Sequence, residues 1–357
     1  MTIASSSLEA SRVASWIDAL RESHAQVAAL IGEISGRTHG SGHATASTRA
    51  PSLAMDGKVS AIYCCVIFAM NWALRAFVVE PLGRAALGYG ATEKWTRSRR
   101  AKTEKFAQSA LEVVIYGGFT ILGMSIVPQQ TWFWPSTEWW RGSPTKTLAT
   151  TAALRCYYLA YGARYVAAAV NVLMEHKRKD FWEMQVHHLA TILVIISSYA
   201  VGWTRVGAVI MLVLDPADVP LHAAKCAKYI GDARGNKRYQ LAADALFGVF
   251  MLTFFVMRLM MYPYVVWSAC FEATKFFSPT FGYRFCIALL SVILFLQVYW
   301  FSLIVKVAHR VVVAGAAEDV RSDDESDDEP TDAVLPKKET VDARVERKAR
   351  VERKKTK

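Results

Sequence analysis

The sequence predicts an all-α polytopic membrane protein with about seven transmembrane helices. Of its 357 residues, 53% are hydrophobic, and they gather in runs long enough to cross a hydrocarbon core about 30 Å thick. Basic residues concentrate in alternate connections between these runs, which is the pattern that orients membrane helices. The net charge of +11 therefore reflects topology. Since no nucleic-acid-binding pattern accompanies it, we expect no nucleic-acid partner.

Seven apolar runs follow one another along the chain. They cover residues 59–79, 109–127, 148–173, 182–203, 206–224, 241–267 and 283–308. The connections after the first, third and fifth runs are rich in Lys and Arg, whereas the other three hold few basic residues. Under the positive-inside rule, the N-terminus lies in the lumen or outside and the C-terminus lies in the cytosol.

The runs divide the chain into five parts. We expect a lumenal N-terminal tail over 1–57, with a weak amphipathic helix at 8–34, and a first transmembrane helix over 58–80. A basic cytosolic loop over 81–105 precedes a membrane domain over 106–310. The tail over 311–357 has nine acidic residues between Glu318 and Asp332, which predict disorder. It ends in KKTK, the dilysine retrieval pattern of the endoplasmic reticulum.

The fourth and fifth runs carry polar groups that a lipid-facing helix should not have. His187 and His188 are adjacent in the fourth run, and Asp215, Asp218 and His222 are spaced in the fifth so that they share one helix face. A charge at membrane depth costs at least a few kcal/mol, so such residues are functional candidates.

The two polar sets are expected at similar depth. If Asp180 marks the start of the fourth run, His187 lies about 10 Å in at 1.5 Å per residue. If Lys225 marks the end of the fifth run on the same side, Asp218 and Asp215 lie about 10 and 15 Å in. We therefore expect imidazole and carboxylate to touch in the cytosolic half of the membrane.

Two further stretches suggest departures from plain membrane helices. Pro216 and Pro220 interrupt the hydrogen bonding of the fifth run to the carbonyls of Leu212 and Pro216. Those carbonyls need new partners, as in a helix that lines a protein cavity, although a packing kink is the alternative. The loop over 131–142 is dense in Trp, which favours an interfacial aromatic belt over ligand stacking.

The histidines allow three kinds of role. A zinc held by His187, His188 or His222 with Asp218 is one alternative, but adjacent histidines on a helix point about 100° apart, so we expect no metal and no cofactor. A polar cluster that ties two helices together is another. Acyl transfer fits better, because His can deprotonate an attacking amine or attack a thioester, with an aspartate fixing its tautomer.

The stretch over 177–225 resembles the signature motif of the ceramide synthases, within the TLC-domain membrane proteins. The motif combines the histidine pair, Arg205-Val206-Gly207 and Asp215-x-x-Asp218. Similarity extends to residues 105–116, 132–140, 258–267, 300–308 and 321–329. The chain departs from the family pattern at Leu214 (usually His), His222 (usually Glu) and Pro216, and the homeobox-like insert of some members is absent.

The resemblance implies N-acylation of a sphingoid base by a fatty acyl-CoA, in the endoplasmic reticulum membrane. The last six spans would form a helical barrel around a lipid tunnel, with the loop over 268–282 associated with chain-length selection. Acyl-CoA is then a substrate rather than a cofactor, and a homodimer or heterodimer is possible. The implied catalytic residues are His187, His188, Asp215 and Asp218, and the implied substrate-binding residues are Lys179, Lys225, Arg238, Arg205 and His222. The alternative is a TLC-domain protein that binds or senses lipid without catalysis.

Overall fold

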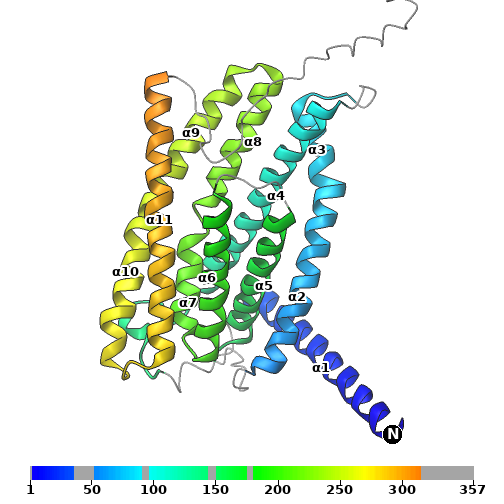
Figure 1. Ribbon diagram of the computed structural model, residues 1–357, viewed down its shortest axis with the longest axis vertical. Coiled ribbons are helices and arrows are strands. Elements are labelled where there is room, and N and C mark those ends of the chain that lie inside the picture. The colour runs from blue at the N-terminus through cyan, green and yellow to red at the C-terminus, as the bar shows by residue number, and fades with distance from the viewer. Residues whose placement is uncertain (1, 36–51, 91–95, 144–149, 175–179, 315–357) are drawn as a thin grey trace, which may run out of the picture.

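The computed structural model describes residues 2–35, 52–90, 96–143, 150–174 and 180–314. Figure 1 shows long helices standing side by side in one bundle, with the first helix slanting away from its lower end. Within the described ranges the elements are helical and no β-strand occurs, as the sequence predicted. They are α1 (Thr2–Ile34), α2 (Leu53–Leu74), η1 (Arg75–Val79), α3 (Glu80–Leu87), α4 (Arg97–Ile126), η2 (Ser136–Trp139), α5 (Ala152–Met174), α6 (Phe181–Ala200), α7 (Thr204–Leu214), α8 (Asp218–Arg234), α9 (Lys237–Phe254), η3 (Phe255–Met261), α10 (Tyr262–Trp267), η4 (Ser268–Glu272), η5 (Ala273–Lys275) and α11 (Phe281–Ala314).

Five helical stretches of the described chain are long and apolar enough to cross a membrane. They are Leu53–Ala86, Arg97–Ile126, Thr204–Arg234, Lys237–Lys275 and Phe281–His309. The third and fourth predicted spans form α5 and α6, whose charged and imidazole side chains lower their hydropathy. Both helices lie within the bundle, α6 between α5 and α11. The polytopic helical class is confirmed, whereas the count of seven spans and a closed barrel stay predictions.

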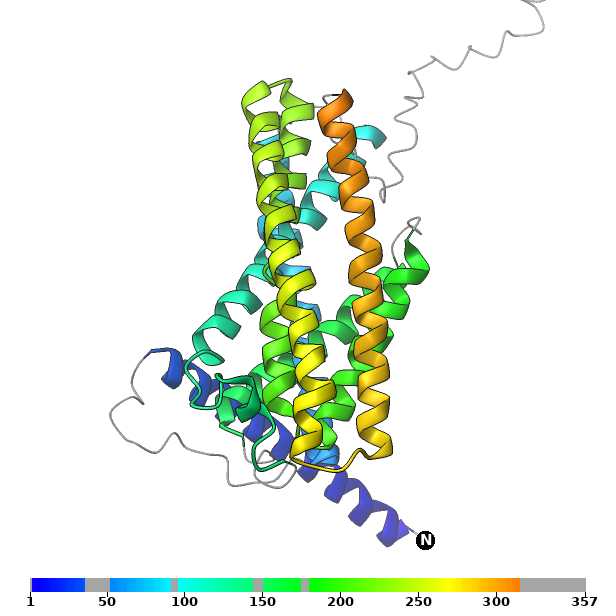
Figure 2. The ribbon, with the colours of Figure 1, turned by 90° about the vertical axis from the view of Figure 1, so that its left-hand side faces the viewer.

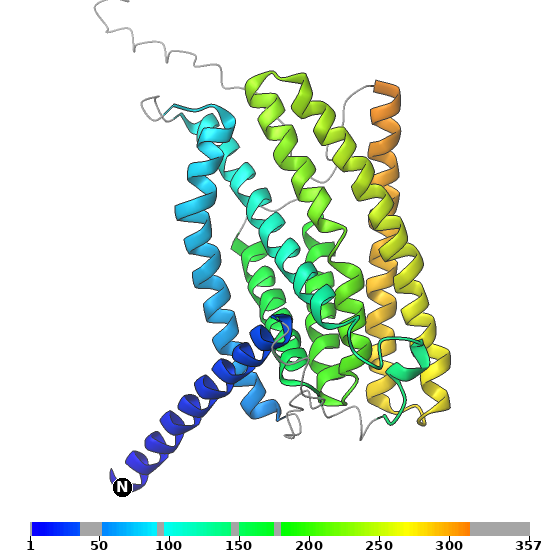
Figure 3. The ribbon, with the colours of Figure 1, turned by 180° about the vertical axis from the view of Figure 1, so that it is seen from behind.

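The helix that begins the described chain and the end of its last helix lie at opposite ends of the bundle. Figures 1 and 3 show α1 at the lower end, while α11 ends at the upper one. The helix expected over 8–34 is present as α1 and packs against α2 and α5. In Figure 3, α4 runs obliquely across the bundle, and its strongest packing is against α8.

The basic loop predicted over 81–105 is wrong in extent, because most of it is helical. α3 ends at Gly88, whose φ of 82° ends the helix in a left-handed cap. α4 begins after Thr96, whose hydroxyl oxygen accepts a hydrogen bond from the backbone N–H of Arg99. Likewise, the fifth predicted span continues to Arg234 and stops at Gly235, with φ 61°. Basic residues favour these extensions because their side chains reach water beyond the apolar core.

The break between α7 and α8 is the central irregularity of the bundle. All residues of α7 except Arg205 are buried, and Pro216 lies in the break. Pro220 falls in the first turn of α8, where its missing N–H costs no helical hydrogen bond. The carbonyl that acquires an outside partner is that of Leu214, which accepts two hydrogen bonds from Arg258. The sequence placed the repartnered carbonyls at Leu212 and Pro216, and that placement is wrong: the carbonyl that receives Arg258 is that of Leu214.

The interfacial belt expected in the Trp-rich loop is wrong for two of its indoles. Trp139 and Trp140 are buried, because each N–H has a protein partner that offsets its removal from water. Trp139 donates to the carbonyl of Phe133, at 2.8 Å, and Trp140 to the hydroxyl of Ser268, at 2.9 Å. Trp134 is exposed, as a belt residue would be.

Candidate active site

A cavity lies between α5, α6, α7 and α11. Its lining is almost entirely apolar or aromatic. The upper boundary of the cavity is formed by one residue from each of these four helices. In chain order they are Tyr161, Thr191, Leu214 and Ile293. The opposite end of the cavity is bounded by Trp140, Trp203 and Tyr283. An apolar pocket of this kind suits a hydrocarbon chain.

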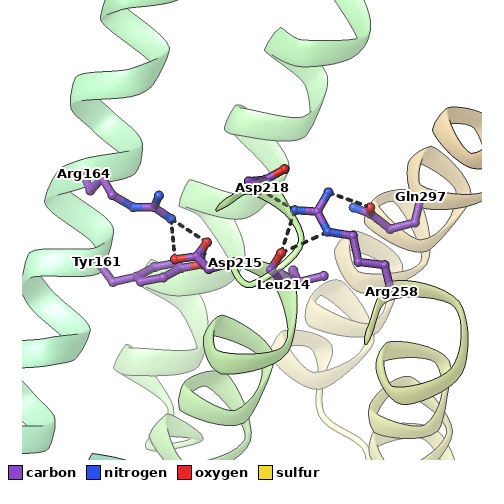
Figure 4. A network of polar contacts seen from close by, with 7 residues as sticks. All are labelled: Tyr161, Arg164, Leu214, Asp215, Asp218, Arg258 and Gln297. Atoms are coloured by element: carbon purple, nitrogen blue, oxygen red, sulfur yellow. Dashed lines mark hydrogen bonds and ion pairs between the residues drawn. The ribbon is translucent and has the colours of Figure 1, made fainter. Parts of the chain in front are cut away.

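Beyond the upper boundary of the cavity the same helices change to polar side chains within about one helical turn. We call this set the polar layer: Arg164 on α5, His187 and His188 on α6, Asp215 and Asp218 at the α7–α8 break, Arg258 on η3 and Gln297 on α11. Figure 4 shows Asp215 and Asp218 at the break, with Arg164 on one side of them and Arg258 and Gln297 on the other. The layer therefore closes over one end of an apolar cavity.

Asp215 is held by Arg164 and Tyr161. The guanidinium donates to both carboxylate oxygens, at 2.8 and 3.1 Å, and the tyrosine hydroxyl donates at 2.8 Å. Both charges of the pair are almost fully buried. Four rings surround the guanidinium carbon at 4.6 to 4.9 Å: Tyr116, Phe119, Tyr161 and Tyr165. This cation–π enclosure compensates part of the desolvation of Arg164.

Asp218 is paired with Arg258, and this second pair spans the helix break (Figure 4). The guanidinium also donates to the carbonyl of Leu214, at 2.6 and 3.0 Å, and to the side-chain oxygen of Gln297, at 3.4 Å. Arg258 lies in the π-helix η3, an irregularity often found at functional sites. Arg258 therefore supplies the hydrogen bonds that the Leu214 carbonyl lacks at the helix break, and it also neutralises Asp218.

The two imidazoles lie in aromatic surroundings. The ring of His187 packs edge-on against Trp300, at 5.2 Å between centroids, and both imidazoles contact Tyr165. The Nδ1 atoms of His187 and His188 are buried and have no hydrogen-bond partner within the described residues. Each ring thus keeps a nitrogen that no group of the described residues occupies.

The expected contact between imidazole and carboxylate is absent among the described residues. Asp215 and Asp218 instead bind arginines. Hydrogen bonds between guanidinium and carboxylate are charge-assisted and stronger than those from a neutral imidazole, so the arginines take the carboxylate oxygens. The depth argument, which compared only histidines and aspartates, left these competitors out.

The predicted substrate-binding residues separate into two groups. His222 lies one turn beyond Asp218 on α8 and stacks on Tyr116, at 5.7 Å between centroids. Lys225 follows on α8, and Arg238 begins α9, so both lie above the polar layer. Arg205 lies at the other end of α7 and donates to the carbonyl of Glu138 at 2.9 Å, so the structure does not bring it to the polar layer. Lys179 lies outside the described residues.

Arg164, Arg258 and Gln297 were missed from the sequence. The rule that singled out the aspartates, namely that charge at membrane depth is costly, applies equally to an arginine inside an apolar run. Applied to Arg164 and Arg258, it would have found both ion-pair partners. Within the described part of the chain, no group of three or more His, Cys, Asp or Glu side chains is arranged to hold a metal.

Residues 105–306 match the family model described as the TLC domain. The match covers more than half of the chain and includes the whole polar layer. The chain belongs to the TLC domain family. The residues that line the cavity of this TLC domain protein all lie within the matched range as well.

Curated relatives of this TLC domain protein include ceramide synthases of animals and plants. Ceramide synthase 4 of Mus musculus is 35% identical over 250 residues, which cover 67% of this chain and 61% of the mouse protein. Ceramide synthase 1 LOH3 of Arabidopsis thaliana is 29% identical over 296 residues, or 78% of this chain and 93% of the plant protein. Ceramide synthase 5 of Homo sapiens is 32% identical over 256 residues, covering 70% and 63%. The chain spans about three fifths of the mammalian relatives that it matches.

Proposed function

We propose that the protein is a ceramide synthase, which transfers the acyl group of a fatty acyl-CoA to the amine of a sphingoid base and releases CoA. The observation that carries this proposal is the position of the histidine pair within one turn of an apolar cavity. An acyl chain lying in the cavity would bring its thioester carbonyl to the polar layer. The similarity to ceramide synthases supports the same reaction.

The amine substrate arrives as an ammonium ion, because an alkylamine has a pKa of about 10.4. A proton must therefore leave before the nitrogen can attack. His187 or His188 can accept it, since each carries a ring nitrogen that has no hydrogen-bond partner in the described ranges. In this direct route the amine nitrogen bonds to the acyl carbon and the carbon–sulfur bond breaks. The second amine proton passes to the departing sulfur, so CoA leaves as a thiol.

A covalent route uses the same residues. An imidazole nitrogen attacks the thioester, CoA leaves as a thiolate, and the acyl-imidazole waits for the amine. The amine then bonds to the acyl carbon, the imidazole leaves, and the amine proton passes to the freed ring. We favour this route because the imidazoles are buried among aromatic rings, which would protect an acyl-imidazole from hydrolysis.

We propose that the aspartates act through their arginines. Asp215 neutralises Arg164, and Asp218 neutralises Arg258, which braces the α7–α8 break. Asp218 is the more accessible of the two carboxylates, so it is also the better group to bind the incoming ammonium. Because each aspartate is paired with one arginine, the polar layer carries little net charge. A layer of this kind can hold a cationic amine beside a neutral imidazole.

The remainder of the acyl-CoA is polyanionic and needs basic partners. Lys225 and Arg238 lie above the polar layer, the side from which a soluble CoA would approach, and Lys179 precedes α6. We propose that the lysine ammonium groups pair with the CoA phosphates as point charges, and that the Arg238 guanidinium binds them through two parallel N–H groups. We also propose that this side is cytosolic, with the N-terminus in the lumen, and that the KKTK end retains the protein in the endoplasmic reticulum.

The test is conversion of a sphingoid base and acyl-CoA to ceramide by the purified protein, with acyl chains from short to very long. Time-dependent ceramide and stoichiometric CoA release are expected, with a preference for one range of chain lengths. Binding of both lipids without turnover would instead indicate a TLC-domain protein that binds or senses lipid. Intact-protein mass spectrometry after adding acyl-CoA alone separates the routes, since only the covalent one leaves an acyl adduct that sphingoid base removes.

A further inference from the structure

One buried stripe of α11 runs from the cavity into the polar layer. Its members recur every three or four residues and are all nearly inaccessible: Cys286, Leu290, Ile293, Gln297, Trp300 and Ile304. The first three line the cavity. Only Gln297 and Trp300 carry nitrogen-bound hydrogens in their side chains, and they come directly after the cavity ends. The stripe thus changes from apolar wall to hydrogen-bond donors at the level of the histidines.

Both donors are unused in the described part of the protein. Gln297 is 0% exposed and Trp300 is 4% exposed, yet Gln297 Nε2 and Trp300 Nε1 have no hydrogen-bond partner there. A buried N–H without an acceptor is unfavourable, and native proteins rarely contain one. An oxygen brought by a ligand would satisfy these donors.

The two side chains are held in defined positions. The amide oxygen of Gln297 accepts from Arg258, at 3.4 Å, and Figure 4 shows the side chain extending from α11 toward the α7–α8 break. The indole of Trp300 packs edge-on against His187. Residues three apart are neighbours on one helix face, so both N–H groups lie on the side of α11 that faces the histidine pair.

We propose that Gln297 and Trp300 form the oxyanion site of the acyl transfer. This proposal rests on the proposed function. As the nucleophilic nitrogen bonds to the thioester carbon, the carbonyl electron pair moves onto oxygen, and the two N–H groups donate to that oxygen. When the carbonyl re-forms, the carbon–sulfur bond breaks and CoA leaves as a thiolate. Preorganised donors of this kind stabilise charge that develops only in the transition state.

The decisive variants remove one donor each. Trp300→Phe keeps a ring against His187 but lacks the N–H, and Gln297→Met keeps the length of the side chain but lacks the amide. Each should lower kcat for ceramide formation by about 10²–10³ with little change in KM for the sphingoid base. Trp267→Phe, a matched change at a half-exposed position, should leave kcat unchanged.

A thioether analogue of the acyl-CoA, which lacks the carbonyl oxygen, tests whether the loss is specific to that oxygen. The analogue should inhibit the wild type and both variants with constants within about threefold of each other. Unchanged kcat in both variants would overturn the proposal. Weaker analogue binding that parallels the loss of activity, or a higher KM for the base at constant kcat, would also overturn it. A wild-type protein that makes no ceramide would instead refute the proposed function.

Discussion

Buried carboxylates lie at both ends of the cavity, but their partners differ: arginines at one end and serine hydroxyls at the other. At the upper end, the polar layer pairs Asp215 and Asp218 with arginines. At the lower end, which we call the aromatic end, the rings of Trp140, Trp203 and Tyr283 bound the cavity, and Glu272 is buried behind them. Comparing the two ends separates a network that closes the cavity from one that binds a ligand.

At the aromatic end, Oε2 of Glu272 and the hydroxyl and indole groups around it are joined by hydrogen bonds. Ser136 and Ser268 each donate to a Glu272 carboxylate oxygen at 2.6 Å, Trp140 donates to Ser268 at 2.9 Å, and the Tyr264 hydroxyl bonds Ser136 at 2.8 Å. Buried side chains that are hydrogen-bonded to one another in this way hold one arrangement. We therefore interpret it as a clamp that holds the Trp-rich loop against the end of the cavity.

The polar layer and its neighbour Trp300 contain buried nitrogens without partners in the described residues, including those of both histidines. Native proteins seldom leave such groups unpaired, so each one requires an explanation. We infer from this contrast that a ligand supplies the missing hydrogen-bond partners in the polar layer. Four predictions test this comparison.

The largest effect is expected in the polar layer. His187→Ala, His188→Ala and Asp218→Asn should each lower ceramide formation by about a thousandfold or more. The thermal midpoint in detergent should change little in the two histidine variants, whereas Asp218→Asn leaves the Arg258 charge without its partner and should also lower the midpoint. His222→Ala should be milder, because that ring stacks on Tyr116 outside the ion pairs. Activity assays on variants matched for expression and thermal midpoint measure this. Near-normal turnover in either histidine variant would assign the unpaired nitrogens no catalytic role.

The second prediction separates charge balance from catalysis. Arg164→Met leaves Asp215 buried without its ion-pair partner, so it should lower the free energy of unfolding by about 3–5 kcal/mol. Asp215→Asn should likewise be severe for activity. The double variant Arg164→Met with Asp215→Leu removes both charges and should recover much of the stability but none of the activity.

Thermal midpoints and ceramide assays on the three variants decide this second prediction. If the double variant is less stable than Arg164→Met alone, the pair is a net source of stability rather than a retained functional charge.

The third prediction concerns the aromatic end, where changes should affect selectivity rather than turnover. Trp140→Ala enlarges the cavity and should shift the preferred acyl chain to greater length, with kcat within about threefold. Gly207→Ala should act in the opposite direction, since its new methyl group would meet the Tyr158 side chain, another cavity residue. Replacing the loop over 268–282 should also change the preference.

A chain-length series with competing acyl-CoAs measures these shifts. The same preference in all three variants would move selectivity from the aromatic end to the side walls of the cavity.

The smallest effect on activity is expected from the C-terminal end, which belongs to neither end of the cavity. Changing Lys354 and Lys355 to Ser should let some protein leave the endoplasmic reticulum while the specific activity in detergent stays constant. Glycosylation acceptors complete the test: one in the N-terminal tail should be modified, and one at the α8–α9 turn should not. The reverse glycosylation pattern would place the polar layer in the lumenal half of the membrane.

The sequence by itself determined the helical membrane class, the approximate position of each long helix, and the polar residues of α6 and of the α7–α8 break. These follow from local physics, because apolar run length, loop charge and proline act within a few residues along the chain. The helix ends beyond the apolar core were harder to predict. They depend on caps such as Thr96 and Gly235, whose effect is small compared with that of hydropathy.

Only the tertiary structure decided which side chains meet. The sequence suggested that histidines contact aspartates, whereas Arg164 and Arg258 approach from other helices and take the carboxylates. The sequence likewise did not reveal that Gln297 follows the end of the cavity, or that Glu272 clamps the Trp-rich loop. The physical reason is that partners from separate helices are chosen by packing and by competition between hydrogen bonds, neither of which is encoded in the spacing of residues along one helix.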